Sequence, residues 1–177
     1  MNPMREIRLA KVTVNMGAGS EAAKLEKCKR IMHTLTKKKI VVTSTQKRST
    51  FGVAKGKPIG VKTTLRGQEA IDFLKKVLQA LENRLKESQF DRNGNFSFGI
   101  HEYINIPGVR YDPDVGILGM DVAVTLERPG FRVRKKRLRP GKVGKAHLIR
   151  KDEAVEWAKK NLGVEVTKEG VREEQTY

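Results

Sequence analysis

The chain has 177 residues, enough for one domain with a hydrophobic core, and its 37 lysines and arginines against 20 aspartates and glutamates give a net charge of +17. The single cysteine excludes an internal disulfide and a zinc ribbon, and helical spacing with Leu25, Met32 and Leu35 indicates a core position for Cys28. No apolar run approaches the ~18 residues that a membrane span needs, and the N-terminus has no signal-peptide pattern, so we expect a cytoplasmic protein without a membrane partner.

The first predicted unit is a strand followed by a helix. Alternating side chains indicate a strand over residues 6–16, with a bulge or a late start near Ala10, where the alternation changes phase. The turn NMGAGS follows, and Ser20 is the predicted N-cap of an amphipathic helix over residues 21–37. This turn either offers backbone N–H groups to a phosphate or simply joins the strand to the helix, and both interpretations remain open.

The second unit is a pair of strands joined by a basic loop. Ile40–Ser44 and Pro58–Arg66 are the two predicted strands. The loop over residues 46–57 holds four cations and one large apolar side chain, so it has little to bury, and we expect it to project from the core and to be mobile in the free protein. The second strand has an apolar face of Ile59, Val61, Thr63 and Leu65 and a polar, cationic face of Gly60, Lys62, Thr64 and Arg66.

The third unit contains the strongest helical period of the chain, over Gln68–Lys86. The turn DRNGN follows, and alternation then predicts strands over residues 96–100 and 120–126, separated by a loop. Phe96 and Phe98 could stack on bases, but they fall on the apolar face of their strand, so we expect them in the core.

The composition changes at Arg128. Residues 128–147 carry too many cations to fold alone, and their prolines and glycines oppose a free helix, so we expect a strap laid along a phosphate backbone. A short helix over residues 152–162 and a flexible tail over residues 163–177 complete the chain. The predicted organisation is an RNA-binding core over residues 1–127 and a strap with C-terminal helix, 128–162, packed on the same domain.

The fold predicted from these elements is α+β, a two-layer antiparallel β-sheet with helices packed on one face. The other face stays open, and an open, polar, cationic sheet face is a platform for RNA. We expect that face to carry some of the side chains of Lys11, Thr13, Asn15, Lys62, Thr64 and Arg66.

The distribution of charge also favours RNA. Residues 27–68 hold 12 lysines and arginines and residues 128–151 hold 11, and neither segment has an acidic residue. The remaining 111 residues have 14 basic and 20 acidic groups, so the positive charge is concentrated in two places. A solvated surface is the alternative interpretation of one short charged run, but two long acid-free segments favour a polyanionic partner.

Enzymatic chemistry finds little support in the sequence. GVAKGKP resembles a phosphate-binding loop but has the wrong glycine spacing and Pro58 where serine or threonine should hold magnesium. His33, His101 and His147 lack metal-ligand spacing, YDPDVG is better explained as a turn than as a calcium loop, and no acid–base cluster is present. We therefore expect an RNA-binding protein without a cofactor rather than an enzyme.

Four motifs in order carry a family resemblance: VNMGAG, PIGVKTTLRG, DRNGNFSFGI and YDPDVGILGMDVAVTLER. Together they resemble the universal large-subunit ribosomal protein number five family over about residues 5–162, and STQKRSTFGVAKGKP and GKVGKAHLIRKDEA resemble its archaeal and eukaryotic branch. The resemblance implies a structural protein of the central protuberance that binds 5S rRNA and large-subunit rRNA beside neighbouring large-subunit proteins. It further implies that the basic loop contacts P-site tRNA and a small-subunit protein at an intersubunit bridge.

These implications assign residues to three sites. Asn15 and Thr64 match family positions that contact 5S rRNA, and further family contacts fall near Lys37 and Lys38. The residues expected at 5S rRNA are Lys11, Thr13, Asn15, Lys37, Lys38, Lys62, Thr64 and Arg66. The residues expected at tRNA and the bridge are Gln46, Lys47, Arg48, Ser49, Thr50, Phe51, Lys55 and Lys57. The residues expected at rRNA from the strap are Arg132, Arg134, Lys135, Lys136, Arg137, Arg139, Lys142, Lys145 and His147. The competing hypothesis is a free-standing RNA chaperone or RNA-processing subunit.

Overall fold

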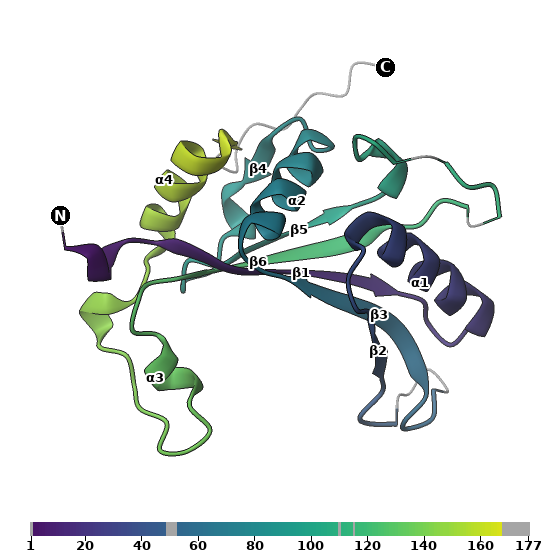
Figure 1. Cartoon of the computed structure of the whole chain (residues 1–177), viewed down its shortest axis with the longest axis horizontal. Helices are drawn as coiled ribbons and strands as arrows, with labels where there is room; N and C mark the ends of the chain where they lie inside the picture. Colours follow the sequence, from purple (N-terminus) through teal and green to yellow (C-terminus); the bar gives the residue numbers. More distant parts are fainter. Residues whose placement is uncertain (1, 49–52, 110, 115, 168–177) are drawn as a thin grey trace.

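The computed structural model describes residues 2–48, 53–109, 111–114 and 116–167. Its centre is a five-stranded antiparallel sheet with strand order β2-β3-β1-β6-β5. Helices α1, α2 and α4 lie on one side of the sheet, while α3 and the far end of the β2–β3 hairpin extend on the other (Figure 1). This is the predicted α+β arrangement.

The strands are β1 (Arg8–Gly17), β2 (Val41–Ser44), β3 (Pro58–Leu65), β4 (Arg84–Lys86), β5 (Phe96–Ile100), β6 (Met120–Glu127) and β7 (Glu165–Thr167). The α-helices are α1 (Ala22–Thr36), α2 (Gln68–Gln79), α3 (Arg132–Lys135) and α4 (Lys151–Leu162). Short 3₁₀ turns are η1 (Pro3–Arg5), η2 (Glu87–Gln89), η3 (Tyr103–Asn105) and η4 (Lys145–His147). No helix of the described residues is both long and apolar enough to cross a bilayer.

Strand β1 is the centre of the sheet because it pairs with β3 on one edge and with β6 on the other. Its pairing with β6 shifts register between Leu9 and Lys11, which confirms the predicted bulge at Ala10. Beyond the bulge, Val12, Val14 and Met16 are buried at even spacing. The neighbouring strand approaches so closely at Gly60 that a Cβ atom there would lie 2.7 Å from the Met16 carbonyl oxygen.

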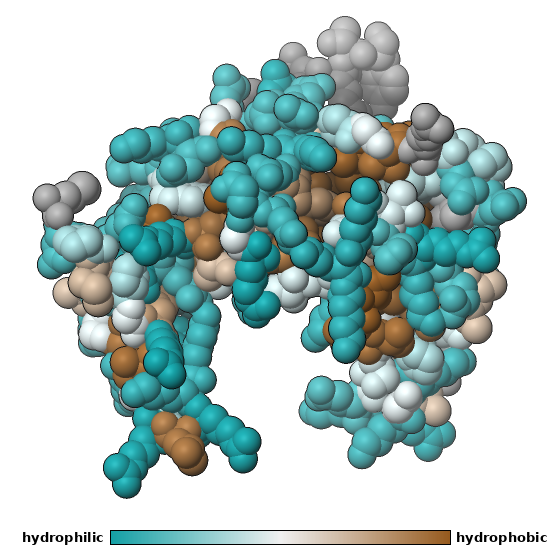
Figure 2. Space-filling model, viewed as in Figure 1, coloured by the Kyte–Doolittle hydropathy of each residue, from teal (hydrophilic) through white to brown (hydrophobic). Residues whose placement is uncertain are grey.

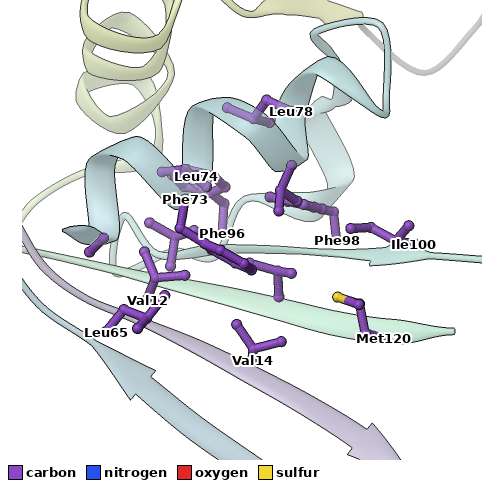
Figure 3. Close-up of a cluster of buried hydrophobic side chains, with 14 of the residues drawn as sticks. Val12, Val14, Leu65, Phe73, Leu74, Leu78, Phe96, Phe98, Ile100 and Met120 are labelled. Carbon is purple, nitrogen blue, oxygen red and sulfur yellow. The ribbon is translucent and has the colours of Figure 1, made fainter. Parts of the chain in front are cut away.

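The hydrophobic core lies between the sheet and helices α1 and α2, and Figure 3 shows the part beneath α2. Leu74 and Leu78 of α2 are fully buried against the apolar faces of the strands, and each such burial stabilises the fold by about 1.5–3 kcal/mol. Phe96 and Phe98 are 2% and 4% exposed, with ring centroids 6.4 Å apart, so both belong to the core, as predicted. Cys28 is buried as well, and burial raises the pKa of its thiol.

The predicted helix over residues 68–86 is too long, because α2 ends at Gln79. Glu82 and Asn83 adopt positive φ angles of 54° and 56°, a left-handed conformation that cannot continue an α-helix. The leucine spacing nevertheless continues past this turn, and Leu85 is buried, but it belongs to strand β4 and not to the helix. Periodicity alone therefore missed the end of the helix.

Two further expectations about local structure are wrong. Ser20 does not cap α1, because the N-cap is Glu21, whose side chain makes no capping hydrogen bond. The tail predicted to start at residue 163 is ordered through Thr167: Val164 is 3% exposed, and β7 pairs with β4 in parallel. The remainder of the predicted tail, residues 168–177, lies outside the described residues.

Candidate nucleic-acid interface

The register of β1 with its neighbours brings the predicted residues of β1 and β3 together on the sheet face opposite α1, α2 and α4, whereas Arg66 is exposed directly after the end of β3. Thr13 pairs with Thr64 and Asn15 pairs with Lys62 in the β1–β3 ladder. Asn15, Lys62 and Thr64 are exposed, whereas their sequence neighbours on β1 and β3 are buried. Lys11 is half-buried on the same side of β1. We call this surface the open face.

The open face is cationic only on its β1–β3 half. In the β1–β6 ladder, Asn15 pairs with Asp121 and Thr13 pairs with Ala123. In the next ladder, Asp121 pairs with Gly99. The β5–β6 half therefore presents small side chains and the carboxylates of Asp121 and Glu127, and Glu127 is paired with Lys135 of the strap. Phosphate groups are accordingly expected to lie over the β1–β3 half of the open face. The sequence did not indicate this asymmetry, because the proximity of Asp121 to Asn15 depends on strand register.

Lys37 and Lys38 lie apart from the open face. Lys37 ends α1 in a left-handed conformation, and its N–H donates to the His33 carbonyl at 2.8 Å. Two residues further on, the Lys39 carbonyl accepts a hydrogen bond from the buried hydroxyl of Thr63. This bond holds the α1–β2 turn on the helix-covered side, where Lys38 pairs with Glu69 at the start of α2 at 2.8 Å. The structure thus does not bring these lysines together with Asn15 and Thr64.

The basic loop continues the β2–β3 hairpin away from the helices. Thr45 closes its base: the backbone N–H donates to the Lys57 carbonyl at 3.0 Å, and the hydroxyl donates to the Ala54 carbonyl at 2.7 Å. The described predicted loop residues, Gln46, Lys47, Arg48, Lys55 and Lys57, are all exposed. Ser49, Thr50 and Phe51, which we also assigned to this loop, lie outside the described residues.

Arg128 holds the two ends of the strap together. Its side chain is 6% exposed, and one guanidinium nitrogen donates to the His147 and Leu148 carbonyls at 3.3 Å each, while the other donates to Glu153 at 2.9 Å. Burial raises the pKa of the Glu153 carboxyl, but hydrogen bonds from the Arg150 backbone and from Arg128 outweigh it and leave that pKa below its ordinary value. The strap is therefore a closed loop with fixed ends.

His147 helps to join the two ends of the strap and is not part of its exposed surface. Its Nε2 atom donates to the Pro129 carbonyl at 2.8 Å, and its ring lies 5.8 Å from that of Phe131. It is half-buried, whereas the neighbouring strap cations are exposed. Lys135 is exposed but pairs with Glu127. The other predicted strap residues, Arg132, Arg134, Lys136, Arg137, Arg139, Lys142 and Lys145, are exposed.

The open face, the hairpin and the strap form one concave surface. The hairpin end and the strap project from opposite ends of the sheet, both on the side away from α1, α2 and α4 (Figure 1). Figure 2 shows these two projections as hydrophilic arms with a hollow between them. The two arms come from the two acid-free segments of the sequence, except that the cations of α1 and of the α1–β2 turn lie on the helix-covered side. The remaining cations concentrate positive charge around the open face, which is the floor of the concave surface.

No group of three or more histidine, cysteine, aspartate or glutamate side chains in the described residues lies close enough to hold a metal ion. The chemistry available on the concave side is hydrogen bonding and charge attraction, and both suit a polyanion. Proteins that bind nucleic acids combine phosphate contacts from lysine and arginine with polar contacts that fix position.

Comparison with known proteins agrees with these features. Residues 2–53 match the family model described as ribosomal protein L5, and residues 58–157 match the model that describes the C-terminus of the same ribosomal family. The chain is 51% identical to large ribosomal subunit protein uL5 of Sulfurisphaera tokodaii over 168 residues, covering 94% of this chain and 95% of that protein. It is 47% identical to the uL5 protein of Methanosphaera stadtmanae, covering 94% and 99%, and 48% identical to that of Pyrobaculum aerophilum, covering 93% of each. The resemblance seen in the motifs is thereby confirmed, and the chain belongs to the ribosomal protein L5 family.

Proposed function

We propose that this chain, as an L5-family protein of the large ribosomal subunit, binds 5S rRNA on its concave surface and large-subunit rRNA through the same surface and the strap. Membership of a ribosomal protein family makes it a structural component of a ribonucleoprotein rather than an enzyme. The observation that carries the proposal is the placement of the cationic strap on the side of the open face (Figure 1). The family resemblance supplies the identity of the RNA.

The floor of the surface suits a structured RNA. Asn15 and Thr64 offer polar groups from adjacent strands, and Lys62 is paired in register with Asn15. If the surface neutralises about six phosphates, 5S rRNA affinity should fall on the order of a thousandfold between 50 and 200 mM salt. A weak salt response would contradict a phosphate-based interface.

A charge-matched pair of variants tests the location of the interface. Lys62→Gln removes a cation from the open face, and Lys75→Gln removes an exposed cation from α2 on the other side of the sheet. Lys62→Gln should weaken 5S rRNA binding and reduce the slope of log affinity against log salt by about one, whereas Lys75→Gln should change neither. Equal losses in the two variants would mean that net charge, and not the open face, determines binding.

The β2–β3 loop is proposed to serve a different partner. Its described cations are exposed at the end of the hairpin, away from the paired floor residues. In line with the family resemblance, we assign the loop to P-site tRNA and to a small-subunit protein at an intersubunit bridge. Replacement of residues 46–57 by a short glycine–serine linker should leave 5S rRNA binding within about threefold, because distant sites are roughly additive.

The same linker variant should lower tRNA retention in the P site or subunit joining, measured on reconstituted particles. Loss of 5S rRNA binding with normal tRNA retention would contradict the assignment of 5S rRNA to the open face and of tRNA to the loop. Stoichiometric cosedimentation with mature large subunits would separate the proposed role from that of an RNA chaperone, which leaves the finished particle.

A further inference from the structure

Leu138 presents a large apolar side chain to water at the far end of the strap. It is 80% exposed, the highest value among the large hydrophobic side chains of the described residues. Figure 2 shows hydrophobic atoms at the end of the strap arm, between hydrophilic side chains. Burying a leucine side chain against a partner is favourable, but single exposed hydrophobic residues are common on protein surfaces, so the surroundings of Leu138 decide its role.

The end of the strap is preformed. The Gly141 N–H donates to the Val133 carbonyl at 3.1 Å and closes the loop that carries Leu138. A Cβ atom at Gly141 would lie 2.7 Å from Val133 Cγ1, so a larger residue there would require the Val133 side chain to rotate. Arg139 has a φ of 50° directly before Pro140, a conformation that non-glycine residues rarely adopt. A partner therefore meets a shaped loop and has less conformational entropy to remove.

The surroundings of Leu138 determine the chemistry of that partner. Leu138 lines a cavity of about 680 Å³ together with four cations, Arg132, Lys135, Lys136 and Arg137. Within the described part of the chain, no acidic residue lines the cavity. Lys135 is paired with Glu127, so the other three cations give the cavity its positive charge. An occupant that carries negative charge and offers an apolar surface to the leucine matches this lining.

We propose that the end of the strap binds one unpaired nucleotide of ribosomal RNA, with the phosphate among Arg132, Lys136 and Arg137 and the base against Leu138. A regular RNA duplex fits less well, because its base faces are stacked inside and its accessible groove presents hydroxyls and base edges. An unpaired nucleotide exposes both a phosphate and a base face. The inference rests on the proposed RNA-binding function and specifies what the strap recognises.

Photochemical crosslinking tests the identity of the occupant. Large subunits are assembled with the full chain carrying p-benzoylphenylalanine in place of Leu138, irradiated, and the crosslinked position is mapped. The expected product joins residue 138 to a nucleotide whose base is unpaired in the particle. A crosslink to protein alone, a crosslink to paired nucleotides alone, or no crosslink in particles that contain the variant would overturn the inference. Absence of even the wild-type protein from the particles would instead contradict the proposed function.

A competition experiment tests the contribution of the leucine. Leu138→Ser and wild type are mixed in equal amounts during assembly, and Ile117→Ser serves as the control, since Ile117 is 60% exposed in another loop. Leu138→Ser should be incorporated about tenfold less than wild type, as expected for losing burial of most of a leucine side chain. Ile117→Ser should be incorporated equally. Equal incorporation of Leu138→Ser, with an unchanged melting temperature, would refute the contact.

Discussion

The buried guanidinium of Arg128 should stabilise the strap more than any exposed cation. Arg128→Met removes two hydrogen bonds of 3.3 Å to carbonyls, worth about 1 kcal/mol each, and an ion pair worth about 1 kcal/mol because Glu153 is 40% exposed. It also removes Nε, which is buried without a partner and costs about 1 kcal/mol. The expected net loss is therefore about 2 kcal/mol, or roughly 4–8 °C in melting temperature.

Two measurements separate a local effect from a global one. The melting temperature of Arg128→Met is compared with that of Arg134→Met, which removes an exposed arginine from the same strap and should shift stability by at most about 0.5 kcal/mol. Trypsin cleavage within residues 129–147 should accelerate in Arg128→Met beyond the acceleration that global unfolding explains. Equal melting temperatures for the two variants would refute the estimate, and unchanged strap cleavage would refute the idea that Arg128 closes the strap.

Three further predictions concern acid stability, the open face and packing. Folding lowers the pKa of Glu153, so its carboxylate stabilises the protein above the unfolded pKa of about 4.3, and this stabilisation is lost as the pH falls through the folded pKa. In acid denaturation, the difference in stability between wild type and Glu153→Gln should therefore shrink below about pH 4. Asn15→Ala and Thr64→Ala should each weaken 5S rRNA binding by about 1–3 kcal/mol if they leave a desolvated partner unpaired, with little change in melting temperature. Unchanged affinity with a large drop in melting temperature would mean that these side chains stabilise the fold and do not contact RNA. Gly94→Ala should lower stability by about 1–3 kcal/mol in thermal unfolding, because its Cβ would lie 2.4 Å from an Ile149 carbon at a φ of 78°, and wild-type stability would contradict this packing.

The strands were predictable because their signal is local. Alternation placed the buried side chains of β1, β5 and β6 correctly, and the change of phase at Ala10 marked a real bulge. The grouping of Asn15 and Thr64 on one surface followed from the same alternation and is present in the structure. A one-face-buried sheet leaves little freedom in these assignments, since a shift by one residue would reverse the two faces.

The features that were missed depend on contacts between distant segments. Leucine spacing continues through residues 80–86, so the turn at Glu82 and Asn83 has no signature in the apolar pattern. The pairing of β4 with β7 joins short segments that carry almost no strand signal of their own. Arg128 was counted among the strap cations, and only the return of the chain to Glu153 explains its burial. The side on which Lys38 lies likewise depends on tertiary packing rather than on local sequence.

The position of β1 in the middle of the sheet has a consequence for synthesis of the chain. Arg8 pairs with Glu127 at one end of the β1–β6 ladder, so one edge of β1 has no partner until the ribosome has made β6. At about 5–20 residues per second, β1 waits roughly 6–25 s for that strand. During this interval the nascent chain can form only the β1–β3 and β2–β3 ladders, and the apolar side chains that later pack on β5 and β6 stay partly uncovered. Completion of the sheet, and with it the floor of the concave surface, is therefore a late event in the synthesis of this protein.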